Sequence, residues 1–239
     1  GDYIMNRIFS ASSASPLRFG RFFLACGLLM LLSEVWKQAC LTFVLNHGSY
    51  EWRYFPFHLC SIPMYILPFL PYTKSPLLRN TFLSFLMTFG LLGGIAVFAD
   101  TSGLHYPLRA LTFHSYAWHV LLIVVGILAA AARYSEMPGS LPGFRDYAGA
   151  VVFYLLCCAA AASINQICGR FGTINMFYIN PDYPMEQIVF SDLVPWLGNL
   201  TVIFLYIGMT VFGAGILFLM WRVLLPRAAA ILSGTVRPV

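Results

Sequence analysis

The sequence predicts an all-α fold, a polytopic membrane helical bundle with about six transmembrane helices. The first observation is composition: 59% of the 239 residues are apolar and 10% are charged, whereas a soluble domain carries about 25% charged residues. The second is a mean hydropathy of +0.77. The third is that the apolar residues fall in runs of roughly 20, the length that a helix needs to cross a bilayer.

Three regions follow from this pattern: a polar N-terminal arm over residues 1–18, a single transmembrane helical domain over residues 19–225, and a C-terminal tail over residues 226–239. The small residues of the arm precede the first apolar run, whereas a signal peptide carries them after it. Short polar loops, or loops with Gly and Pro, separate the apolar runs. The predicted crossings are residues 19–45, 55–72, 81–99, 110–132, 147–168 and 195–225.

The second crossing, residues 55–72, differs from the others because it contains Pro56, Pro63 and Pro68. Each proline removes a backbone donor and bends or breaks a helix. In lipid such breaks persist only where neighbouring helices, side chains or water satisfy the freed backbone groups. We therefore expect this segment to lie against the protein interior, with His58 and Cys60 facing protein partners.

The distribution of Lys and Arg predicts the orientation of the chain. On one side of the membrane the arm, alternate loops and the C-terminus hold ten of these residues, and the other side holds three. Cytoplasmic loops carry the excess of positive charge, so both termini are predicted to be cytoplasmic. The ten are Arg7, Arg18, Arg21, Lys74, Arg79, Arg133, Arg145, Arg222, Arg227 and Arg237, and the three are Arg53, Arg109 and Arg170.

Several functions are disfavoured by composition. The net charge of +5 is scattered over loops without a basic stripe, so no nucleic-acid partner is expected. The six cysteines show no regular spacing, which is not the pattern of a disulfide framework or a zinc module. The lipid bilayer is the one partner that the composition itself predicts.

With this orientation the unusual polar residues fall in the outer, non-cytoplasmic half of the bundle. Glu34 and Lys37 interrupt the first crossing, and the outer end of the second carries His58 and Cys60. His114 lies at the outer end of the fourth. The fifth ends with Asn165, just before a long loop that contains Asn175. Ionisable groups inside a membrane are rare and face the bundle interior or a wet cavity, so a common polar site is predicted.

Each of these residues also has a plainer interpretation. Glu34 and Lys37 are three residues apart on one helix face, where they can form a neutralised pair, and this structural role is favoured. On a regular helix His58 and Cys60 point to nearly opposite sides. His114 on another helix is therefore the better base for a Cys60 thiolate. From the residues alone, Cys60 is favoured as a small apolar packing residue, as free cysteines usually are.

No metal or other cofactor is predicted. His114 and His119 are five residues apart, about 140° around a helix, so they do not form a helical metal pair. His119 is interpreted as a core histidine with one hydrogen bond. A metal site built from His58, His114 and Glu34 stays open, but no local motif supports it. The pair Gly90 and Gly94 is interpreted as a helix-packing motif.

The sequence also resembles a known family of membrane proteins. The resemblance is carried by Ser33-Glu34, the Pro56–Cys60 run with His58-Leu59-Cys60, Phe113-His114-Ser115 and the Gly172–Tyr178 loop. With these residues the chain looks like the YwaF-type bacterial membrane proteins, which are relatives of eukaryotic transmembrane protein 164. The Pro-x-His-Leu-Cys run is its most specific part. The loop at Gly172 and the segment around Pro195 depart from the family pattern.

The resemblance implies an integral membrane lipid acyltransferase in the bacterial cytoplasmic (inner) membrane, acting on a membrane phospholipid or lyso-lipid. By match, Cys60 is the candidate nucleophile, His114 the candidate base, and His58 a motif residue with an open role. Glu34, Asn165 and Asn175 are candidate substrate-binding residues. Backbone groups freed by Pro63, with Asn165 or Asn175, are candidates for stabilising an oxyanion.

Two other classes of function remain open from the sequence. The polar residues are also consistent with a small-solute or proton path, which would depend on Glu34 and His114 but not on Cys60. They are equally consistent with a structural subunit of a membrane assembly, in which they serve only helix contacts. Acyl transfer and ester hydrolysis are not distinguished either.

Overall fold

The computed structural model describes residue 17, residues 19–136 and residues 141–232, and the described residues form helices joined by loops and turns, without a strand. Most of the predicted N-terminal arm and the end of the predicted tail lie outside these residues. The long helices are α2 (Gly20–Ala39), α6 (Arg109–Glu136), α7 (Phe144–Cys168) and α9 (Asn199–Leu232). The shorter helices are α3 (Ile62–Ile66), α4 (Pro76–Phe85), α5 (Leu91–Ala96) and α8 (Val194–Leu197).

Five helical segments of the described chain are long and apolar enough to cross a membrane. Two of them contain a π-helical turn: Cys40–Leu45 extends α2, and Leu86–Gly90 joins α4 to α5. The five segments are Gly20–Leu45, Pro76–Ala99, Arg109–Ser135, Phe144–Cys168 and Asn199–Ile231.

The sixth crossing is the proline-containing segment, which runs antiparallel to α2 although only five of its residues form the helix α3. At one end Gln38 of α2 bonds the carbonyl of Tyr54. At the other end Gly20 of α2 lies against Pro71. Residues 20 and 38 of a helix are about 27 Å apart at 1.5 Å per residue, close to the roughly 30 Å hydrocarbon thickness. The prediction of about six crossings is therefore confirmed, and the second crossing is a broken one.

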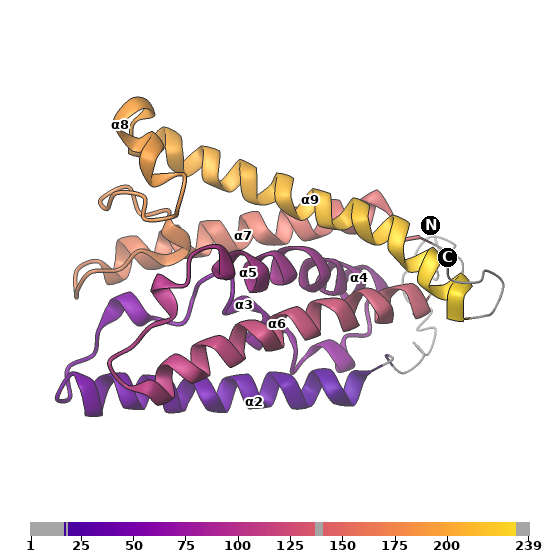
Figure 1. Cartoon of the computed structure of the whole chain (residues 1–239), viewed down its shortest axis with the longest axis horizontal. Coiled ribbons are helices and arrows are strands. Elements are labelled where there is room, and N and C mark those ends of the chain that lie inside the picture. Colours follow the sequence, from indigo (N-terminus) through magenta and orange to yellow (C-terminus); the bar gives the residue numbers. More distant parts are fainter. Residues whose placement is uncertain (1–16, 18, 137–140, 233–239) are drawn as a thin grey trace, which may run out of the picture.

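The crossings alternate in direction, so α2 begins and α9 ends at the same end of the bundle (Figure 1). We call this the near end. The opposite end, which contains residues 46–54, 100–108 and 169–198, is called the far end. At the near end the buried Arg133 of α6 forms an ion pair with Asp146 of α7. The same carboxylate accepts a hydrogen bond from the Gly143 N–H, which caps α7.

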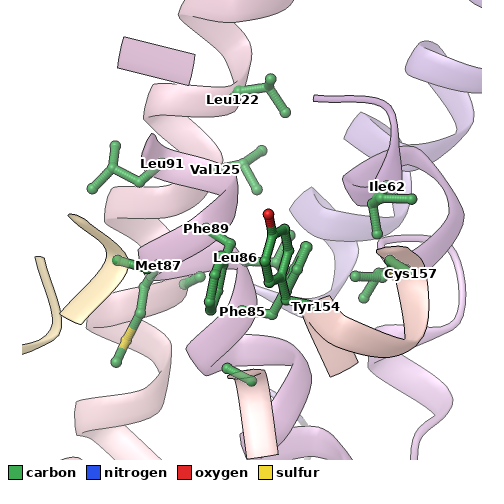
Figure 2. Packing of buried hydrophobic residues seen from close by; sticks show 14 of the residues in the cluster. Ile62, Phe85, Leu86, Met87, Phe89, Leu91, Leu122, Val125, Tyr154 and Cys157 are labelled. Carbon is green, nitrogen blue, oxygen red and sulfur yellow. The ribbon is translucent and has the colours of Figure 1, made fainter. Parts of the chain in front are cut away.

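The core is centred on the π-helical turn between α4 and α5 (Figure 2). The rings of Phe85 and Phe89 stack at 5.5 Å, and Tyr154 of α7 stacks on Phe89 at 4.7 Å. The Met87 carbonyl accepts a hydrogen bond of 2.8 Å from the Trp221 indole of α9. A side chain thus satisfies a backbone acceptor inside the bundle, as a membrane interior requires.

Glycine allows the closest helix contacts. The predicted packing role is confirmed for Gly94, where a Cβ would lie 3.0 Å from Leu122 of α6, whereas a Cβ on Gly90 would make an ordinary contact of 3.6 Å with Pro63. Gly27 of α2 is tighter still: a Cβ there would lie 2.6 Å from Pro68 and 2.8 Å from Leu67. The broken crossing therefore packs directly on the backbone of α2.

Replacing Gly27 by alanine should separate α2 from the broken crossing and lower the free energy of unfolding by about 1–3 kcal/mol, the usual cost of overpacking. Gly208→Ala on α9 is the matched control, since nothing lies within 4 Å of a Cβ at that position. Thermal unfolding of both variants in detergent checks the contact. Equal melting temperatures for the two variants would contradict it.

Candidate functional site

Cys60 lies at the far end, in the turn that precedes α3. Residues 58–61 form a bend and turn and not a regular helix. The His58 carbonyl accepts hydrogen bonds from the N–H groups of Ser61 at 2.8 Å and Ile62 at 3.3 Å. The opposed side-chain directions expected of a regular helix therefore do not apply to His58 and Cys60.

Trp118 of α6 connects Cys60 to His114. Its indole N–H donates a hydrogen bond of 3.1 Å to the Cys60 carbonyl. The His114 ring, one helical turn away on the same face of α6, lies 5.5 Å from the Trp118 ring. The His114 ring also lies 5.7 Å from the ring of Trp36 on α2. Three separate elements of the chain thus converge on His114 and the turn that contains Cys60.

A buried carboxylate and its partners border the same region. Glu34 is 5% exposed and forms the predicted ion pair with Lys37 at 2.8 Å. The Gln38 amide donates to the Glu34 carboxylate and to the Tyr54 carbonyl, each at 2.7 Å. The structure thus contains the predicted pairing of Glu34 with Lys37, and Gln38 ties this pair to the start of the broken crossing.

The charges of this pair act on the site residues. Lys37 is close enough for its charge to act on His58, Cys60 and His114. The Glu34 charge acts on Cys60 and His114. Such charges are felt over a longer distance inside a bundle than in water, because the dielectric constant is lower.

The loop after α7 is held by Asn165 at its base. The Asn165 side chain donates a hydrogen bond of 3.1 Å to the Met176 carbonyl and accepts one of 2.7 Å from the Met176 N–H. In the loop itself, the Asn175 side-chain oxygen accepts from the Asn180 N–H at 3.0 Å. The Asn180 side-chain amide in turn donates a hydrogen bond of 2.8 Å to the Ile174 carbonyl. Both polar atoms of Asn165 are therefore used by the loop, which gives this predicted substrate-binding residue a positioning role.

Two consecutive loop residues, Phe177 and Tyr178, have left-handed backbone angles, with φ of 57° and 58°. This conformation is costly for large side chains and persists only where the surroundings impose it, often at functional sites. Its result here is that the Tyr178 ring lies 5.1 Å from His58 and the Phe177 ring 5.8 Å from Phe57. Burial raises the pKa of Tyr178 to about 12, so its phenol stays protonated and can donate a hydrogen bond.

Four buried polar atoms of this region have no hydrogen-bond partner among the described residues. They come from four different elements: Gln38 Oε1, His58 Nδ1, His114 Nε2 and Asn175 Nδ2. An unsatisfied buried polar group costs about 1–3 kcal/mol, and each such group in a native protein requires an explanation. Buried donors and acceptors without protein partners, gathered toward one end of a bundle, are what a ligand site offers.

The other predicted histidine has a structural role. His119 is buried, and its Nδ1 donates 2.8 Å to the Ser115 carbonyl one turn back. It is the core histidine that the sequence predicts. Among the described residues no group of three or more His, Cys, Asp or Glu side chains is placed to hold a metal ion.

Trp118, Tyr178 and Gln38 are the site residues that the sequence did not single out. Trp118 follows His114 by four residues, a spacing that would have placed the two on one helix face. The position of Tyr178 depends on left-handed backbone angles that its residue type does not favour. Gln38 acts through a contact with the Tyr54 carbonyl, just before the next crossing, which no local pattern reveals.

Six crossings with a buried polar cluster at one end define a polytopic helical membrane protein with a candidate ligand site inside the bundle. The model of the TMEM164 family matches residues 4–225, and the chain belongs to this family. The resemblance to relatives of transmembrane protein 164 is thus confirmed. No curated protein and no solved structure shows a significant match to the chain.

Replacing Asn165 by alanine should free the loop, because the buried Met176 N–H loses its partner and the Met176 carbonyl keeps only the 3.4 Å hydrogen bond from the Ile179 N–H. We expect the free energy of unfolding to fall by about 1–3 kcal/mol, with faster hydrogen exchange at residues 175–180. The neighbouring Gln166 is exposed, so Gln166→Ala should change stability by less than about 0.5 kcal/mol. Unaltered exchange in the Asn165 variant would show that the loop is held by other contacts.

Proposed function

We propose that the protein is an integral membrane lipid acyltransferase, in which Cys60 carries the acyl group and His114 moves the proton. The observation that carries the proposal is the link through Trp118, which bonds the Cys60 carbonyl and packs on the His114 ring. The unpartnered Nε2 of His114 supports the assignment, since a general base needs a free lone pair. The resemblance to relatives of transmembrane protein 164, whose family model matches residues 4–225, implies the same class of reaction.

In the first half-reaction the Cys60 thiol gives its proton to His114 Nε2. The thiolate attacks the carbonyl carbon of a phospholipid ester, and the carbonyl π pair moves to oxygen. When the tetrahedral intermediate collapses, the ester C–O bond breaks. The leaving lyso-lipid oxygen takes the proton from His114, and the acyl group remains on Cys60 as a thioester.

The second half-reaction reverses these steps and transfers the acyl group from Cys60 to a different lyso-lipid. A lyso-lipid hydroxyl gives its proton to His114, attacks the thioester carbon and receives the acyl group. The C–S bond breaks, and the Cys60 thiolate recovers the proton from His114. Water as acceptor would make the same residues a lipase, so acyl transfer requires that the lyso-lipid reaches the thioester in preference to water.

The oxyanion needs hydrogen-bond donors. A backbone group freed by Pro63 would be a carbonyl, which accepts but does not donate, and Asn165 is already used by Met176. The unpartnered Nδ2 of Asn175 is the better candidate. The protonated Tyr178 phenol beside His58 is a second donor, and His58 has the role of orienting the substrate through its free Nδ1.

We place the site in the non-cytoplasmic half of a bacterial cytoplasmic membrane. The far end carries Arg53, Arg109 and Arg170, and the near end carries most of the remaining Lys and Arg. The positive-inside rule then assigns the near end, and both termini, to the cytoplasm. A cysteine-reactive, membrane-impermeant label on a cysteine introduced at exposed Gly103 would report this sidedness.

Reconstitution tests the proposed activity. Purified protein is placed in vesicles of phosphatidylethanolamine, phosphatidylglycerol and phosphatidylcholine that contain a deuterated-acyl phospholipid and a lyso-lipid. We expect the deuterated acyl chain to appear on the lyso-lipid, as measured by mass spectrometry, at a rate proportional to protein. Release of free fatty acid alone would make the protein a hydrolase, and no movement of the label in any of the three lipids would contradict the proposal.

A further inference from the structure

We propose that an apolar groove beside Cys60 holds one fatty acyl chain of the lipid substrate; this inference deepens the proposed function and rests on it. The groove lies between α3, α4 and α7 and encloses about 440 Å³, within the roughly 300–1,000 Å³ of small-molecule sites. Figure 2 shows two of its lining residues, Ile62 and Cys157, side by side. Its other lining side chains include Phe57, Tyr65, Phe82 and Phe153.

The lining is apolar along its whole length. The one polar atom of the larger side chains, the Tyr65 hydroxyl, is already used, because it donates 2.8 Å to the Pro56 carbonyl. Phe82 and Phe153 form part of the lining, with ring centroids 5.3 Å apart. A ligand in this groove gains contact area without any hydrogen bond, which suits a hydrocarbon chain and excludes a headgroup.

The groove adjoins the polar site at Phe57. This residue directly precedes His58, and its ring lies 6.3 Å from Tyr65 of the groove and 5.8 Å from Phe177. Phe177 precedes Tyr178, whose ring packs on His58. An ester carbonyl at Cys60 would therefore have its acyl chain directed past Phe57 and into the groove.

The groove is also open to the bilayer. Tyr65 is 39% exposed and Phe69, at the rim, is 68% exposed, and this surface of a crossing segment faces lipid tails. An acyl chain can enter sideways from the membrane without passing through water. A second apolar groove of about 410 Å³, between α7 and α9, has no such link to the polar site and serves as the control.

The first test measures occupancy without relying on catalysis. Wild-type protein and Cys60→Ala are placed in vesicles with a phosphatidylcholine that carries a diazirine at the end of one acyl chain. After illumination, we expect labelled peptides from residues 65–69 and 153–157 to exceed those from residues 208–219 in both proteins. Equal labelling of the two grooves would mean general lipid contact only, and cross-links between two copies at residues 65–69 would mean a protein interface. Either result would overturn the inference.

The second test measures chain-length selectivity. Cys157→Phe shortens the groove, so its transfer rate with stearoyl relative to octanoyl donors should fall by about tenfold or more, the usual effect of excluding methylenes from an apolar pocket. Phe153→Trp narrows the same space if the first variant does not fold. Gly208→Leu fills the control groove and should leave the stearoyl-to-octanoyl ratio unchanged.

The two proposals fail in different ways. If wild-type protein transfers acyl groups but neither groove variant alters the ratio, the groove inference is wrong and the enzymatic proposal stands. If no acyl transfer occurs, the proposed function is lost. Selective diazirine labelling in that case would identify the groove as a lipid site that serves another purpose.

Discussion

Cys60→Ala should reduce acyl exchange between labelled lipids in vesicles to the rate of protein-free vesicles. In the proposed mechanism Cys60 is the group that carries the acyl chain between the two half-reactions, so both halves stop together in this variant. Folding should be preserved, because the contact that the turn makes with α6 uses the Cys60 carbonyl and not the thiol. Thermal unfolding in detergent, measured beside the exchange assay, separates the two effects.

The matched control is Cys168→Ala. Cys168 is likewise a free, half-buried cysteine near the far end of the bundle. We expect this variant to retain wild-type exchange. Exchange that survives in Cys60→Ala would remove the thioester mechanism, and equal loss in both variants would mean a structural effect.

His114→Ala should lower the exchange rate by about 10²–10⁴-fold, the range that a positioned general acid or base contributes. Turnover should fall more than apparent lipid affinity, because the proton transfers occur in the transition states. His119→Gln is the control on the same helix, since His119 is buried and bonded to the Ser115 carbonyl. A small effect at His114 with a large effect at His58 would transfer the role of base to His58.

Much of the fold can be predicted from the sequence because a membrane restricts the choices. A spanning segment must satisfy its own backbone groups, so each long apolar run indicates a helix, and the predicted range 147–168 lies within Phe144–Cys168. Prolines locate the breaks in the second crossing. They do not predict that Leu67 and Pro68 will pack directly against Gly27, because that contact depends on the register between two crossings.

The candidate site was predictable only in part. Charge asymmetry and hydropathy place Glu34, His58, Cys60 and His114 at similar depth, but depth does not show which helix faces meet. The hydrogen bond from the Trp118 indole to the Cys60 carbonyl shows which faces meet, and it joins residues that are 58 positions apart in the sequence. Asn165 shows the opposite case, where a polar residue at the right depth is used by a loop backbone.

The most direct test is isolation of the acyl-enzyme. Protein is incubated in vesicles with a deuterated-acyl phospholipid and no lyso-lipid, stopped in acid, and the cysteine-containing peptides are analysed by mass spectrometry. We predict a deuterated acyl group on the peptide that contains Cys60, removed by neutral hydroxylamine and accumulating further when the acceptor is absent. Active protein whose Cys60 peptide never carries the acyl group, or carries it no more than the Cys168 peptide does, would contradict the account.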